Sequence, residues 1–255
     1  MSIRAALERR RGGAVLRITL DNPEKANSLS PAALSRLAGV FQKIKGNKQL
    51  RAVVVTGEGR KVFCGGADLA TLGALTPSSA RKFIGLVHAA CQAARDCPVP
   101  VIARVNGWCL GAGLEFAAAC DLRIASSNAR FGMPEVRLAI PSVVEAALLP
   151  RLMGAGRARW LVLTGESIDA KTALTWGLIE RICSPREFDA TIDAILKNDA
   201  KALQMQKRLC TLWEESPLEN SIRVSVEALA RAYESDEPRR RVAALRRARR
   251  GRKAR

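Results

Sequence analysis

The stretch that decides the fold reads Asn106-Gly107-Trp108-Cys109-Leu110-Gly111-Ala112-Gly113-Leu114-Glu115, and Phe131-Gly132-Met133-Pro134-Glu135 follows it. Both end in a glutamate, and the two glutamates are twenty residues apart. Residues 99–105 are rich in β-branched side chains and are bounded by a proline and an Asn-Gly pair, which predicts a buried strand. The apolar, alanine-rich residues 112–120 predict a buried helix. We therefore expect a strand that enters a helix through a glycine turn.

The start of this helix has two interpretations. Backbone N–H groups at a helix start lack intrahelical partners and can hold an oxygen that becomes negative during a reaction. Glu115 falls in the first turn, beside those donors. In the simpler interpretation, the glycines serve only the turn and Glu115 only compensates the helix dipole.

A second segment favours the catalytic interpretation. Residues 51–57 predict another buried strand, followed by a turn at 58–61 and by Val62-Phe63-Cys64-Gly65-Gly66-Ala67-Asp68-Leu69. That stretch is again a glycine turn entering a short helix. Two sets of N–H groups at neighbouring strand ends suit chemistry in which a carbonyl oxygen gains charge.

These residues resemble the enoyl-CoA hydratase/isomerase family, the crotonase superfamily, over nearly the whole chain. The resemblance rests on the order and spacing of several short motifs. The matching residues are 22–29, 63–69, 106–115, 119–125, 131–135 and 163–166, then Ala173, residues 176–178, Gln206 and Lys207.

The resemblance implies an acyl-CoA substrate whose thioester carbonyl accepts two backbone hydrogen bonds, here from Gly65 and Ala112. It implies that Glu115 and Glu135 hold and activate a water that adds across the α,β double bond. Two carboxylates near each other and an apolar wall tend to have their pKa values pushed apart, which gives one acid and one base. Isomerases of the family often keep only one of the pair, so both together favour an enoyl-CoA hydratase.

The same resemblance implies contacts to coenzyme A, which enters as part of the substrate. No permanently bound cofactor and no metal are expected. Lys25 either faces the coenzyme phosphates or is a solvated loop lysine, and Ala26 offers backbone groups only. The further expected contacts are Gly66, Ala67, Asp68 and Leu69.

The segment after Glu135 departs from the hydratase pattern. Residues 136–146 contain no glycine where the family has a glycine-rich turn, and they add Arg137 and Glu145. Glu145 is interpreted either as a helix-surface charge or as a sign of a functionalised acyl group. The alternatives to hydration are therefore double-bond isomerisation, thioester hydrolysis or decarboxylation.

Composition limits the other classes of function. The chain has 255 residues, 48% of them hydrophobic, which is enough for one sizeable core. We expect no membrane span and no secretory signal, and a transit peptide is a possible but poor interpretation of the N-terminus. Seven cysteines without Cys-x-x-Cys spacing suit reduced thiols in the cytoplasm. His88, the only histidine, is interpreted as a packing residue, which argues against a histidine triad or a zinc site.

The net charge of +18 is concentrated at the C-terminus. Residues 238–255 hold ten basic and no acidic residues, so the rest of the chain carries +8. This tail is interpreted as a solubilising segment, as a segment near a neighbouring subunit's coenzyme site, or as an RNA-binding element. The last interpretation would make the protein an RNA-binding protein on a crotonase scaffold. Aromatic residues make up only 4% of the chain, which argues against base stacking.

The expected organisation has three parts. Residues 1–185 are expected to form an α/β crotonase-like spiral of ββα units that holds the acyl-CoA site. Residues 186–237 are expected to form a C-terminal helical trimerisation region, followed by the Arg-rich tail at 238–255. The resemblance implies a homotrimer or a dimer of trimers.

Overall fold

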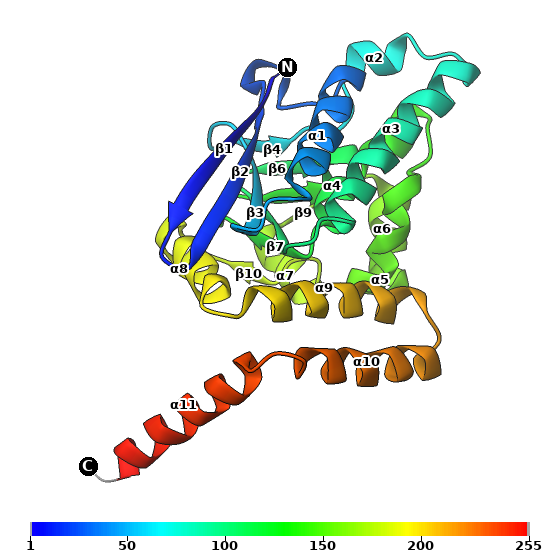
Figure 1. Ribbon diagram of the computed structural model, residues 1–255. Helices are drawn as coiled ribbons and strands as arrows, with labels where there is room; N and C mark the ends of the chain where they lie inside the picture. The colour runs from blue at the N-terminus through cyan, green and yellow to red at the C-terminus, as the bar shows by residue number, and fades with distance from the viewer. Residues whose placement is uncertain (1, 254–255) are drawn as a thin grey trace. The chain divides into compact units, whose positions relative to one another are not determined.

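Continuous apolar runs form a six-stranded sheet in the computed structural model, which describes residues 2–253 and the side chains of residues 3–249. An antiparallel hairpin of β1 (Ser2–Arg10) and β2 (Gly13–Asp21) lies at one edge (Figure 1). The parallel strands β3 (Leu50–Gly57), β5 (Val101–Val105) and β7 (Leu122–Ala125) follow, and β10 (Arg181–Ile182) ends the sheet. Because helices cover both faces, these strands are apolar at nearly every position.

Four short strands form a second sheet that continues from the ends of the first. They are β4 (Val62–Cys64), β6 (Trp108–Leu110), β8 (Arg130–Gly132) and β9 (Ser167–Asp169). A long strand, a short strand and a helical segment therefore follow one another three times along the chain. This repetition confirms the predicted α/β spiral of ββα units.

Helices cover one face of the large sheet and enclose the main core. The helices α1 (Pro31–Ile44) and α3 (Pro77–Arg95) lie side by side, and α4 (Ala112–Ala119) is buried at every position. The other helical segments of this part are η1 (Pro23–Lys25), α2 (Leu69–Gly73), η2 (Pro134–Leu138), η3 (Val144–Leu148), α5 (Leu149–Met153), α6 (Ala155–Thr164) and α7 (Ala170–Trp176).

Helix α8 (Pro185–Leu196) covers the opposite face of this sheet. Its Phe188, Ile192 and Leu196 pack against strand residues such as Val54 and Ile102. From the sequence we grouped residues 186–196 with the C-terminal helices. In the structure they belong to the first compact unit, which ends at Asn198, because their apolar face completes a second core under the sheet.

The second compact unit runs from Asp199 onwards and is helical. It consists of α9 (Ala200–Glu215), α10 (Leu218–Ala232) and α11 (Glu237–Lys253). The basic tail is helical through Lys253, and its last two residues lie outside the described part of the chain. Among the described helices, none is both long and apolar enough to cross a membrane.

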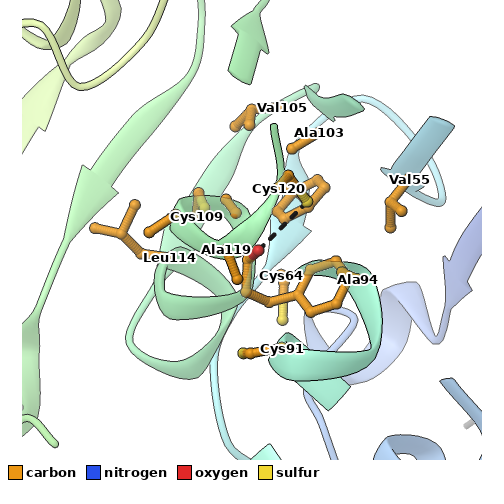
Figure 2. Packing of buried hydrophobic residues seen from close by; sticks show 14 of the residues in the cluster. Val55, Cys64, Cys91, Ala94, Ala103, Val105, Cys109, Leu114, Ala119 and Cys120 are labelled. Carbon is orange, nitrogen blue, oxygen red and sulfur yellow. Dashed lines mark hydrogen bonds between the residues drawn. The ribbon is translucent and has the colours of Figure 1, made fainter. Parts of the chain in front are cut away.

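Four buried cysteines gather around α4 in the main core. Figure 2 shows Cys64 of β4, Cys91 of α3, Cys109 of β6 and Cys120, the residue after α4, among small apolar side chains such as Ala103. All seven cysteines of the chain are free thiols. Burial raises the pKa of the Cys64 thiol to about 12. We therefore find no thiolate nucleophile at the position that borders the first glycine turn.

Candidate active site

The second glycine turn has a backbone that only glycine adopts easily. Gly111 has φ 49° and ψ −125°, and α4 begins directly after it. Its carbonyl accepts hydrogen bonds from Leu114 and Glu115, so it closes the first turn of the helix. Within the described residues, no acceptor engages the N–H of Ala112. This donor is available at the predicted position.

The first glycine turn corrects one predicted donor. The N–H of Gly65 donates to the carbonyl oxygen of Ala26 at 2.8 Å, so it is already engaged within the protein. Leu29 pairs with the next residues, donating to Gly66 at 2.7 Å and accepting from Asp68 at 3.0 Å. Because N–H groups alternate in direction along extended backbone, the N–H of Ala67 points away from Leu29. It meets no acceptor among the described residues and replaces Gly65 as the available donor.

The two turns are packed tightly against each other. A Cβ atom on Gly66 would lie 2.9 Å from the carbonyl oxygen of Leu110 and 3.7 Å from the nitrogen of Ala112. A Cβ atom on Gly113 would lie 2.6 Å from the Cβ of Cys64. Close backbone approach therefore explains these two glycines, and it brings the Ala67 and Ala112 turns together.

Glu115 lies in the first turn of α4 and is only 3% exposed. The N–H of Ala146 donates to its Oε1 at 3.3 Å. Burial, followed by the negative charge of Glu135, raises the pKa of Glu115 to about 8. This carboxyl group therefore holds a proton at neutral pH.

Glu135 reaches the same turn from η2. The register of β6 and β8 pairs Leu110 with Gly132, which sets the start of η2 beside the start of α4. The hydroxyl of Ser142 donates to Oε2 of Glu135 at 3.0 Å, and a Cβ atom on Gly111 would overlap the other carboxylate oxygen. Burial raises the pKa of Glu135 too, while the Ser142 hydrogen bond opposes the shift. The structure thus brings both predicted glutamates to one turn.

Glu145 and His88 correct two further expectations. Glu145 is buried on η3 and is not a surface charge. His88 is exposed on α3 and is not a packing residue, and its Nδ1 lies 2.7 Å from Oε1 of Glu145. The local sequence around Glu145 does not distinguish a buried carboxylate from a surface charge. No local pattern indicates its histidine partner, which is 57 residues away.

The predicted coenzyme contacts lie around the first turn. Lys25 is exposed on η1, and both backbone groups of Ala26 already bond within the protein. The side chain of Asp68 caps α2 by accepting from the N–H of Thr71 at 2.9 Å. The two Thr71 hydrogen bonds, and more weakly the charge of Lys25, lower the pKa of Asp68. Leu69 is 70% exposed. Their contacts with coenzyme A stay predictions.

An apolar groove of about 820 Å³ borders the Glu135 segment. Its polar lining groups include Ser142, which also binds Glu135, and Arg159. The apolar lining residues include Val136, Ile140, Val143, Val162 and Leu163. This surface lets an apolar group lie close to the carboxylate.

Comparison with known proteins identifies the family of the chain. The family model for enoyl-CoA hydratase/isomerase matches residues 10–240. The short-chain-enoyl-CoA hydratase of Clostridium acetobutylicum is 33% identical over 230 residues, which cover 88% of each chain. The putative enoyl-CoA hydratase/isomerase YngF of Bacillus subtilis is 41% identical over 169 residues, covering 66% of this chain and 65% of its own length.

Solved structures agree at the level of the fold. The enoyl-CoA hydratase of Mycobacterium smegmatis superposes with a TM-score of 0.90 at 28% identity, over 96% of each chain. That of Bacillus anthracis superposes with a TM-score of 0.88 at 28% identity, over 97% of each chain. The chain therefore belongs to the enoyl-CoA hydratase/isomerase family, the crotonase superfamily of enzymes.

Proposed function

We propose that this enzyme is an enoyl-CoA hydratase, a hydro-lyase that adds water across the α,β double bond of an enoyl-CoA thioester. The observation that carries the proposal is the meeting of Glu115 and Glu135 at the start of α4. The hydratase names of two relatives with similar chain length, those of Clostridium acetobutylicum and Syntrophomonas wolfei, support it.

The thioester oxygen accepts hydrogen bonds from the N–H groups of Ala67 and Ala112. These donors stabilise the negative charge that the oxygen gains as the enolate forms. The loss of one such donor typically costs ~10²–10³ in rate. Gly65 has no direct role in this proposal because Ala26 holds its N–H.

The two glutamates divide the proton transfers. Glu135, stabilised as a carboxylate by Ser142, takes a proton from water while the water oxygen bonds to Cβ of the substrate. Glu115, protonated at neutral pH, gives its proton to Cα. Both protons of the product thus have a source, and the apolar groove beside Glu135 supports binding of an apolar acyl group.

Coenzyme A binds along the first glycine turn as part of the substrate. Lys25 faces its phosphates as a point charge, and Gly66, Ala67, Asp68 and Leu69 line its path. The exposure of Lys25 and Leu69 supports this placement.

The test is hydration of crotonyl-CoA, followed by loss of the conjugated-thioester absorbance. We expect Glu135→Gln to lower kcat by ~10²–10⁴, because an amide cannot take the proton. Glu219→Gln, an exposed glutamate of α10, is the control and should keep the wild-type rate. A Glu135→Gln protein as fast as wild type would refute the role of Glu135.

The matching family includes isomerases as well as hydratases, and the buried Glu145 supplies a further carboxylate for moving a proton, so double-bond isomerisation is the second candidate. A 3-enoyl-CoA substrate tests it, because isomerisation creates the conjugated absorbance that hydration removes. A folded protein that turns over the 3-enoyl-CoA but not crotonyl-CoA would be an isomerase.

A further inference from the structure

Three titratable side chains of the site region, those of Glu115, Glu145 and His88, differ in how far they are exposed to solvent. Glu115 on α4 is 3% exposed, and the side chain of Glu145 on η3 is 7% exposed. The side chain of His88 on α3 is 56% exposed. The exposure of these groups therefore rises along the series from carboxyl to carboxyl to imidazole.

The proposed hydration creates a need for such a series, and the inference below rests on that proposed function. Each turnover leaves Glu115 ionised and Glu135 protonated. Glu135 is half-buried and exchanges its proton with solvent directly. Glu115 is buried, so it requires a route by which a proton returns.

The contacts of Glu145 fit that route. Its Oε1 is held by Nδ1 of His88 at 2.7 Å, whereas its Oε2 is buried with no nitrogen or oxygen partner among the described residues, and the only other group close enough to hydrogen-bond to this carboxylate there is the thiol of Cys91. A buried polar atom without a hydrogen-bond partner typically costs ~1–3 kcal/mol of folding free energy. A catalytic role is one reason for which proteins keep such an atom. The backbone at Val144 is strained as well, with φ 40° for a β-branched residue.

Glu145 also lies within the electrostatic reach of Glu115. The N–H of Ala146, the next residue, binds the Glu115 carboxyl. The charges of Glu145 and Glu115 both act on the thiol of Cys91, which shares α3 with His88. Cys91 is one helical turn from His88, so the three elements meet at one place.

We infer that His88 and Glu145 carry a proton from solvent to Glu115 after each turnover. His88, whose side chain is exposed, takes a proton from solvent at Nε2 and gives the Nδ1 proton to Oε1 of Glu145. The carboxyl group rotates and passes its proton to ionised Glu115. Glu145 is then a carboxylate again. His88 is left as its Nε2–H tautomer and regains the Nδ1–H tautomer by proton exchange with water, and no bond other than those to hydrogen changes.

The experiment measures crotonyl-CoA hydration by His88→Ala in dilute buffer that contains no imidazole. We expect kcat to fall roughly tenfold or more while kcat/KM stays unchanged, because proton return follows the chemical step and becomes rate-limiting. Added imidazole should restore kcat in proportion to its concentration, since it replaces the missing side chain. Lys82→Gln, an exposed lysine on the same helix, should show neither the loss nor the buffer dependence.

Glu145→Gln separates the relay from a structural role. Its amide cannot carry the proton, so we expect a similar fall in kcat that imidazole does not restore. The double variant should lose no more than either single variant, because the two residues act as one unit. Thermal unfolding of each variant identifies losses that come from misfolding.

Two outcomes overturn the inference. One is a His88→Ala protein with the wild-type kcat in dilute buffer, and the other is a loss of kcat that imidazole leaves unchanged. Both presuppose that the wild-type protein hydrates crotonyl-CoA. A wild-type protein that fails to do so refutes the proposed function itself, so the two failures are distinguishable.

Discussion

At the scale of single residues, the buried carboxyl group of Glu115 links the proposed chemistry to the stability of the protein. In the proposed hydration Glu115 gives its proton to the reacting carbon, and burial favours the protonated form at neutral pH. The same burial penalises the ionised form that each turnover creates. Catalysis and stability therefore depend on pH through the same side chain.

Glu115→Gln should stabilise the protein at alkaline pH. The folded-state pKa of about 8 lies above the ordinary value of 4.5, so the folded state binds more protons between these values. The stability of the wild type relative to the variant therefore falls as pH rises from about 4.5 to 8, by up to ~1.4 kcal/mol per pH unit. Urea unfolding of both proteins at pH 5 and pH 9 measures the difference. An equal difference at both values would contradict the assigned pKa.

Gly111→Ala should lower activity far more than stability. The new methyl group would overlap the Glu135 carboxylate and displace it, at a cost of about 10²-fold in kcat. The backbone at φ 49° adds a strain of ~1–3 kcal/mol.

Gly39→Ala in α1 is the matched control, because nothing lies within 4 Å of its new Cβ. It should stabilise by ~0.5–1 kcal/mol at full activity. A fully active Gly111→Ala protein would rule out this placement of Glu135.

Some site residues could be predicted from the sequence because their signals are local. The glycine turns and the spacing of Glu115 and Glu135 are read along the chain itself. The exchange of Gly65 for Ala67 could not be predicted, because the direction of each N–H depends on pairing with Leu29. The contact between His88 and Glu145 depends on how α3 packs against η3, which no local pattern specifies.

At the scale of elements, the buried strands were the most predictable parts. β3 and β5 were expected as continuous β-branched runs, and both lie inside the parallel sheet. The sequence places helix α8 with the C-terminal helices, whereas the structure places it in the first unit. An amphipathic pattern shows that a helix buries one face, but it does not show which other element that face packs against. Its partner face, with Val15 and Ile124, comes from strands more than sixty residues away.

Arg123→Ala should be strongly destabilising. The buried guanidinium donates to the carbonyl of Cys120 at 2.8 Å, beyond the end of α4, and to that of Leu178 at 2.9 Å, and it pairs with Glu180. Its removal leaves buried carbonyls without donors, at a cost of about 3 kcal/mol. Arg130→Ala breaks a more exposed pair with Asp169 and should cost ~0–1 kcal/mol. Urea midpoints that fall equally in both variants would refute this distinction.

At the scale of the whole molecule, the second, helical unit carries its positive charge and its exposed apolar surface on different helices. The basic residues concentrate on α11, whereas α10 exposes an apolar row at helical spacing. The row consists of Leu218, Ile222, Val226 and Leu229, each more than half exposed. The predicted trimer or dimer of trimers would cover this row. The RNA-binding and solubilising roles of the tail stay predictions, as does the cytoplasmic location.

Ile222→Asp should weaken assembly, because a charge on the row opposes its burial between chains. We expect light scattering to give a mass of several chains for the wild type and of fewer chains for the variant. Glu227→Ala, on the same helix, should keep the wild-type mass. A wild-type protein that is already a single chain would refute the predicted assembly.

The five buried cysteines, four of which form the cluster around α4, can report the rate at which the protein unfolds. In the native protein, a thiol reagent meets exposed Cys210 at once and half-buried Cys183 more slowly. The five buried thiols do not react with the reagent in the folded protein, because they are inaccessible and because burial keeps thiols such as that of Cys64 protonated. Under excess reagent, the slow labelling of these five thiols therefore follows the rate at which the first unit opens. Mass spectrometry would then read kinetic stability, molecule by molecule, without any added probe.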